Sequence, residues 1–146
     1  MGSKKKKLSL KFKARLILYD RGRILLLKQT RGNGGNYTLV GGTVEADEFA
    51  REALIRETRE ESGITVAAED LTLVHVLNKR TKKGQRINLY FKASRYSGRV
   101  QNLEDHKFKS VQWFAINKLP SDTTNTVRQA LRAYRAGRLY SEQSKK

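Results

Sequence analysis

Three glutamates, Glu57, Glu60 and Glu61, stand close together in a stretch rich in helix-forming residues. Residues 46–62 begin with acidic residues and end before a Gly-Ile pair, a pattern typical of a helix of about four turns. At about 100° per residue, the three glutamates continue the arc of an apolar stripe. That stripe is formed by Phe49, Ala50, Ala53 and Leu54.

An acidic stripe that continues a buried face is unfavourable on its own. Like charges one helical turn apart repel by about 0.2 to 0.5 kcal/mol per pair, and more where water is excluded. Arg56 lies one turn from Glu60 but cannot neutralise three carboxylates. A solvated face with ion pairs is the ordinary alternative for a Glu-rich helix. Magnesium, which binds through carboxylates and substrate phosphates, would compensate the cluster.

The spacing around these glutamates carries a family resemblance. Gly42, five residues, Glu48, seven residues and then Arg-Glu-Thr-Arg-Glu-Glu-Ser-Gly-Ile at 56–64 resemble the Nudix box. All seven fixed letters are present, and Thr58 departs mildly at an aliphatic position. Within this family the chain resembles the MutT-like branch. The resemblance implies an α/β fold, a Nudix α/β/α sandwich with a mixed β-sheet. It also implies hydrolysis of a diphosphate linked to another moiety.

The resemblance also implies roles for individual residues. Glu60 and Glu61 look like the principal metal ligands, and Glu57 looks like a third ligand or the base that activates water. The carbonyl of Gly41 looks like a further ligand, because a residue without a side chain lets the main chain approach an ion. Supporting or catalytic positions would be Gly42, Glu48, Arg56 and Gly63, with a salt bridge between Glu48 and Arg56.

Other site positions come from outside the box. A further carboxylate ligand would be Glu104 or Asp105, with a slight preference for Glu104. Arg23 is a candidate for holding a phosphate, and Thr38 for reading the edge of a base. Tyr37 and Trp113 either stack on a base or belong to the core. His75 and His106 lack a second ligand at metal-binding spacing, so we expect them not to bind metal.

The charge of the chain is unusual. The 146 residues include 31 Lys and Arg against 14 Asp and Glu, a formal net charge of +17, and there is no cysteine. This balance favours a polyanionic partner, and nucleic acid is possible beside a nucleotide or nucleoside-diphosphate-linked small molecule. Lys11, Lys13 and Arg15 alternate with apolar residues, and we interpret them as the wet face of a sheet. No apolar run suits a membrane span, so we expect a cytoplasmic protein.

Hydrophobic periodicity predicts the order of elements. Strands are expected at 8–18, 24–27, 37–40, 71–77, 87–93 and 111–114, with a turn at 20–22, loops at 30–36 and 97–109, and a final amphipathic helix around 127–134 closed by Gly137. We expect a single domain at 8–140 between a basic disordered tail at 1–7 and a polar tail at 141–146.

Together these features predict a Mg²⁺- or Mn²⁺-dependent pyrophosphohydrolase. Its substrate would be a nucleoside triphosphate or another nucleoside diphosphate derivative. The alternatives are a pyrophosphohydrolase acting on RNA 5′ ends, and a noncatalytic Nudix module that binds nucleotides or RNA through its basic surface. The sequence leaves the oligomeric state open.

Overall fold

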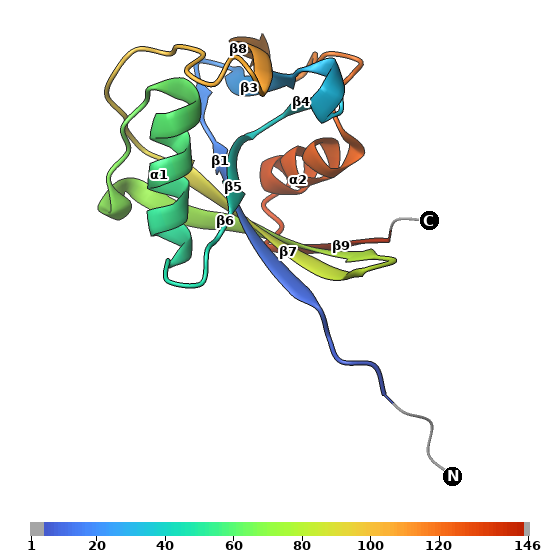
Figure 1. Ribbon diagram of the computed structural model, residues 1–146. Coiled ribbons are helices and arrows are strands. Elements are labelled where there is room, and N and C mark those ends of the chain that lie inside the picture. The colour runs from blue at the N-terminus through green and yellow to red at the C-terminus, as the bar shows by residue number, and fades with distance from the viewer. Residues whose placement is uncertain (1–4, 145–146) are drawn as a thin grey trace.

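The computed structural model describes residues 5–144 and is shown in Figure 1. These residues form nine strands, two α-helices and two short 3₁₀ helices. In chain order they are β1 (Leu10–Ile17), β2 (Tyr19–Asp20), β3 (Arg23–Gln29), η1 (Arg31–Asn33), β4 (Tyr37–Thr38), β5 (Val40–Thr43), α1 (Ala50–Ser62), η2 (Ala68–Asp70), β6 (Leu71–Thr81), β7 (Gly84–Ala93), β8 (Phe108–Ala115), α2 (Asn125–Arg135) and β9 (Tyr140–Ser144).

The strands form two sheets. The larger has the order β5-β1-β7-β6-β9, in which β1 runs parallel to β7 and β6 parallel to β9, while the β1–β5 and β6–β7 pairs are antiparallel. The smaller is antiparallel and is built on β3, which pairs with β2, β4 and β8. The predicted α/β class with a mixed sheet is confirmed, and the strands divide between two sheets.

Two apolar clusters fill the space between the sheets and helices. Ala14 and Leu16 of β1 belong to the cluster beneath α1, whereas Ile17 belongs to the cluster beneath α2. Alternation along a strand sends neighbouring side chains to opposite faces, so β1 contributes to both clusters. Figure 1 shows α1 and α2 on opposite sides of β1 and β5. This layering places the edge strand β5 beside α1.

Several predicted elements are confirmed with changed boundaries. The central helix begins at Ala50 rather than at residue 46. The preceding residues form a turn in which the backbone N–H of Glu45 donates to Glu48 at 3.1 Å, and that of Phe49 donates to Glu52 at 2.8 Å. The hairpin of β6 and β7 extends further than predicted on both sides of its turn. Helix α2 begins after Thr124, whose hydroxyl accepts the N–H of Val127 at 3.2 Å.

The prediction of a polar tail at 141–146 is wrong for residues 141–144, which belong to β9. Their sequence lacks apolar alternation because their contacts are polar. The Ser141 hydroxyl lies 2.7 Å from Nε2 of buried His75, and Thr126 of α2 donates to Gln143 at 2.7 Å. Residues 145–146 lie outside the described residues, as do residues 1–4 of the predicted basic tail. Residues 5–7 are exposed and outside regular secondary structure.

Neither described α-helix combines the length and the apolar character required to span a membrane.

Candidate active site

The turn that leads from β5 toward α1 depends on two glycines. Gly41 has a φ of 138°, and a Cβ there would collide with the carbonyl oxygen of Ala14 on β1. A Cβ on Gly42 would lie 2.8 Å from the carboxyl carbon of Glu57. The missing side chains therefore let β5 pair closely with β1 and let the carboxylates of α1 lie against the β5 backbone.

Three carboxylates converge beside this turn, and we call them the carboxylate cluster: Glu57, Glu61 and Glu104. One oxygen from each lies within 4.8 Å of the others. Glu57 and Glu61 are one helical turn apart on α1, whereas Glu104 comes from the loop before β8. Helical periodicity places the first two on one face, and the loop supplies the third from a distant part of the chain.

The cluster has the properties of a site for a hard cation. Glu61 is only 5% exposed, and its Oε1 accepts the N–H of Gly41 at 2.9 Å. Oε1 of Glu104 is buried and accepts no hydrogen bond from the described residues. An unpaired buried carboxylate oxygen is costly unless a cation or a donor compensates it. The donor set, made of carboxylate oxygens, suits Mg²⁺ or Mn²⁺.

The charges of the carboxylate cluster also favour a cation at this site. Burial raises the pKa of Glu61 to about 8, an effect that the Gly41 N–H opposes and that the negative charges of Glu57 and Glu104 increase. A divalent cation between these groups would reverse the balance, because it favours the charged carboxylate.

Arg56 organises the acidic residues around the cluster. Its guanidinium binds Glu48 with two hydrogen bonds of 2.7 and 3.0 Å, so the predicted salt bridge is present. Its Nη1 also donates to Oε1 of Glu57 at 2.9 Å. The hydrogen bond from Arg56 lowers the pKa of Glu48, and the partners of Arg56 raise its own pKa. Arg56 therefore ties the turn before α1 to a member of the cluster.

The other residues predicted from the box lie close by, with different surroundings. The side chain of Glu60 is 51% exposed, contacts Arg56 Nη1 at 3.4 Å and does not join the cluster, so its role as a principal ligand stays a prediction.

The carbonyl oxygen of Gly41 accepts a hydrogen bond from Arg15 at 3.2 Å. A cation bound to this oxygen would share it with Arg15. Gly63 ends α1 with a φ of 75°. Asp105 is exposed, whereas Glu104 joins the cluster.

A cleft of about 220 Å³ lies on the side of β1 that faces α2. We call it the basic cleft, because four of its lining residues are Lys or Arg. The lining residues are Lys13, Arg15, Gln29, Thr38, Lys79, Arg86, Asn88, Tyr90, Thr124, Thr126 and Val127.

The basic cleft corrects one interpretation of the sequence. Lys13 and Arg15 do not form a wet face of the sheet, since both are partly buried in this cleft. Burial, together with nearby Arg15 and Arg86, lowers the pKa of Lys13 to about 8. Burial also lowers the pKa of Arg15, an effect that Glu61 and Glu57 oppose. Alternating cations on a strand do not reveal which face is covered, because that depends on α2.

The two residues predicted to bind substrate, Thr38 and Arg23, have different surroundings. Thr38 lines the basic cleft, whereas Arg23 does not line it and lies over the ring of Trp113, 5.5 Å from its centre. Tyr37 packs edge-on against Phe114 with ring centres 5.1 Å apart. Trp113 packs against the cluster beneath α1 and Tyr37 against the cluster beneath α2, and both side chains are partly buried. Base stacking by either residue stays a prediction. Of the two histidines, His75 is buried and lies 2.9 Å from the Arg138 carbonyl.

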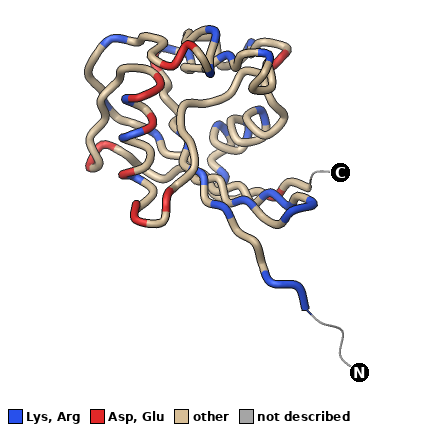
Figure 2. Tube along the Cα trace, in the orientation of Figure 1, with Lys and Arg blue, Asp and Glu red and all other residues tan. Residues whose placement is uncertain are grey.

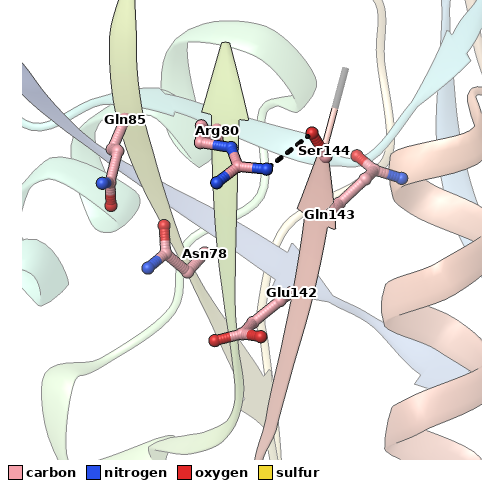
Figure 3. Close-up of a pocket in the computed structure, with 6 residues that line it drawn as sticks. All are labelled: Asn78, Arg80, Gln85, Glu142, Gln143 and Ser144. Carbon is pink, nitrogen blue, oxygen red and sulfur yellow. Dashed lines mark hydrogen bonds between the residues drawn. The ribbon is translucent and has the colours of Figure 1, made fainter. Parts of the chain in front are cut away.

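A larger hollow of about 380 Å³ lies on the other face of β6, and Figure 3 shows the side chains that line it. Asn78 and Arg80 alternate with Lys79 of the basic cleft, so they point to the opposite side of the strand. The hollow combines Arg80, which donates to Ser144 at 3.4 Å, with the carboxylate of Glu142. It lacks the converging carboxylates of the cluster and the cation excess of the basic cleft, so it is not the candidate site.

Comparison with known proteins agrees with the geometry. A model of the NUDIX domain matches residues 11–134. The chain is 32% identical over 106 residues to the NAD-capped RNA hydrolase NudC of Pseudomonas aeruginosa, covering 72% of this chain and 36% of that protein. It is 30% identical over 105 residues to the ADP-ribose pyrophosphatase of Methanocaldococcus jannaschii, covering 71% of this chain and 61% of that protein. The chain thus spans about a third of the NudC relative.

Solved structures share the fold. The MutT NUDIX hydrolase from Burkholderia pseudomallei superposes with a TM-score of 0.77 at 28% identity, covering 85% of this chain and 97% of that one. The MutT protein from Methanosarcina mazei has the same TM-score of 0.77 at 19% identity, covering 90% of this chain and 97% of that one. The family match over residues 11–134 and the shared α/β fold define the class of this protein. The chain belongs to the Nudix family.

Proposed function

We propose that this chain hydrolyses a phosphoanhydride bond in a nucleotide derivative, using a divalent cation held by the carboxylate cluster. The observation that carries the proposal is the convergence of Glu57, Glu61 and Glu104 within 4.8 Å. When bound there, Mg²⁺ or Mn²⁺ would neutralise phosphate oxygens and make a bound water more acidic.

The residues of the chain supply the remaining functions. Glu61, fixed by the Gly41 N–H, would hold the cation against the β5 backbone, and Glu104 would hold it from the loop before β8. Glu57 would either share the cation or accept the proton of the attacking water. Arg56 would orient Glu57 through the 2.9 Å hydrogen bond. Glu60 remains a candidate ligand on the exposed side of α1.

The relatives suggest which bond is cut. One is named for NAD-capped RNA and the other for ADP-ribose, and both of these compounds contain a diphosphate that joins two ribose units. We infer that the substrate of this chain contains such an internal diphosphate or, as the second possibility, a nucleoside triphosphate.

Charge favours a second candidate, an activity on RNA 5′ ends. The net charge of +17 includes basic residues along the N-terminal strand and the β6–β7 hairpin, which Figure 2 shows in blue. Phosphate contacts of this kind give affinity that falls steeply with salt. An RNA substrate would therefore show turnover that declines with salt much more steeply than turnover of ADP-ribose.

A panel of substrates tests the proposal. ADP-ribose, NAD⁺, a nucleoside triphosphate and a 5′-capped RNA are incubated with the chain with Mg²⁺ or with a chelator, and products are separated by chromatography. We expect metal-dependent cleavage that Glu61→Gln and Glu104→Gln each reduce at least a hundredfold, and that Glu69→Gln, an exposed acid outside the cluster, leaves unchanged. Glu60→Gln shows whether that residue also binds the cation. Tight RNA binding without metal-dependent turnover would instead identify a noncatalytic module.

A further inference from the structure

The basic cleft is a second charged feature beside the carboxylate cluster. Lys13 and Arg15 lie on one face of β1. Arg86 lies on the neighbouring strand β7, opposite Lys11 of β1. Lys79 of β6 donates to Thr126 of α2 at 3.0 Å. Cations from three adjacent strands therefore face one small volume.

Three of these cations form no salt bridge within the described part of the chain, and the negative charges of Glu61 and Glu57 act on Arg15 at longer range. Among the described residues, Lys13, Arg15 and Arg86 form no salt bridge within 4.0 Å. The guanidinium of Arg15 donates to the main-chain carbonyls of Leu39 and Gly41 at 3.1 and 3.2 Å, which leaves its positive charge in place. Crowded, partly buried cations repel one another, and an anionic ligand would relieve that repulsion.

The rest of the lining also offers hydrogen-bond donors to an anion. Its remaining side chains are mostly hydroxyls and amides: Gln29, Thr38, Asn88, Thr124 and Thr126. The N-terminus of α2, which begins at Asn125 after Thr124, borders the cleft and adds the positive end of a helix dipole. Tyr37 and Trp113 do not line it, and Tyr90, an aromatic residue that does, is only 1% exposed. A volume of about 220 Å³ is below the roughly 300 to 1,000 Å³ of sites for larger ligands.

The cleft is close enough to the cluster to act on the same substrate. Arg15 contacts the carbonyl of Gly41, whose N–H binds Glu61. One glycine thus separates a cation of the cleft from a carboxylate of the cluster. A ligand that extends from the scissile diphosphate across β5 would bring its next group to Lys13, Arg15 and Arg86.

We propose that the basic cleft binds a phosphate group of the substrate that is not cleaved, so that the preferred substrates carry a phosphate beyond the scissile diphosphate. This inference builds on the proposed function. The additional phosphate comes either from a phosphomonoester on a ribose or from a longer linear phosphate chain. The chemistry that the cleft recognises, a compact anion with several acceptor oxygens, is the same in both cases.

Binding without catalysis tests the inference separately from the proposed function. Affinities are measured by calorimetry in the presence of a chelator for two pairs of probes, NADP⁺ against NAD⁺ and tripolyphosphate against pyrophosphate. The first pair differs by one phosphomonoester and the second by one linear phosphate. We expect the more phosphorylated member of at least one pair to bind about tenfold more tightly, the contribution of one charge-assisted contact. The pair that discriminates identifies the source.

Variants localise the effect. Arg86→Met and Lys13→Met should each reduce the tenfold preference to about threefold or less, whereas Lys118→Met, which removes one exposed charge outside the cleft, should retain it. Thermal unfolding of each variant confirms that it is folded. Equal affinities within both pairs would overturn the inference, as would a preference that survives both cleft substitutions or that Lys118→Met reduces equally. Failure of metal-dependent turnover with an intact preference would overturn only the proposed function.

Discussion

The buried carboxylate of Glu61 should make the stability of the metal-free protein depend on pH. Its pKa is about 8 in the folded chain, against 4.5 for an ordinary glutamate, mainly because of burial. The folded state therefore holds this proton more tightly than the unfolded state does. The contribution of Glu61 to the free energy of unfolding is complete below pH 4.5 and is lost as the pH rises toward 8. At about 1.36 kcal/mol per pH unit, the loss reaches up to about 5 kcal/mol.

Urea unfolding at pH 5, 6, 7 and 8 in a chelator measures this effect (about 1.36 kcal/mol per pH unit). Glu61→Gln removes the titration, so the free energy of unfolding of the variant relative to the wild type should rise across the series. The pKa of Lys13, lowered to about 8, affects stability above that pH and cancels in the comparison. Divalent metal should flatten the wild-type curve, because it binds the charged carboxylate. Parallel curves for the two proteins without metal would refute the reasoning.

Three substitutions test the surroundings of the cluster. Thr58 is 0% exposed and its hydroxyl has no partner among the described residues, so Thr58→Val should stabilise the protein by about 1 kcal/mol in urea unfolding. A loss of stability would show that the hydroxyl is satisfied. Arg56→Met removes the hydrogen bonds to Glu48 and Glu57 and should destabilise by about 1 to 3 kcal/mol while reducing kcat; unchanged kcat would exclude an orienting role. Gly42→Ala places a Cβ 2.8 Å from the Glu57 carboxyl carbon, so metal affinity should fall about tenfold with the fold retained in circular dichroism. Unaltered affinity would show that Glu57 moves without consequence.

The sequence predicted the parts of the site that depend on one helix. Glu57 and Glu61 share a face because of helical periodicity, whereas the pairing of Glu48 with Arg56 was implied by the family resemblance. Glu60 and Glu61 lie toward opposite edges of that arc. Periodicity does not show that Glu61 packs against the Gly41 N–H whereas Glu60 is exposed.

Features built from distant segments were not predictable in the same way. Lys13 and Arg86 reach the basic cleft through the parallel pairing of β1 with β7, which no local pattern specifies. β9 was missed because its polar residues pair with β6 and contact α2 through hydrogen bonds, so it lacks the apolar alternation of a strand. Glu104 was only slightly preferred over Asp105, because the path of a loop is not encoded by periodicity.

Anomalous diffraction from crystals soaked in Mn²⁺ is the most direct test of the central claim. We expect a metal peak within coordination distance of oxygens of Glu57, Glu61 and Glu104. The peak should disappear in Glu61→Gln and persist in Glu69→Gln. A peak bound elsewhere on the chain, with these three carboxylates left without metal, would contradict the account.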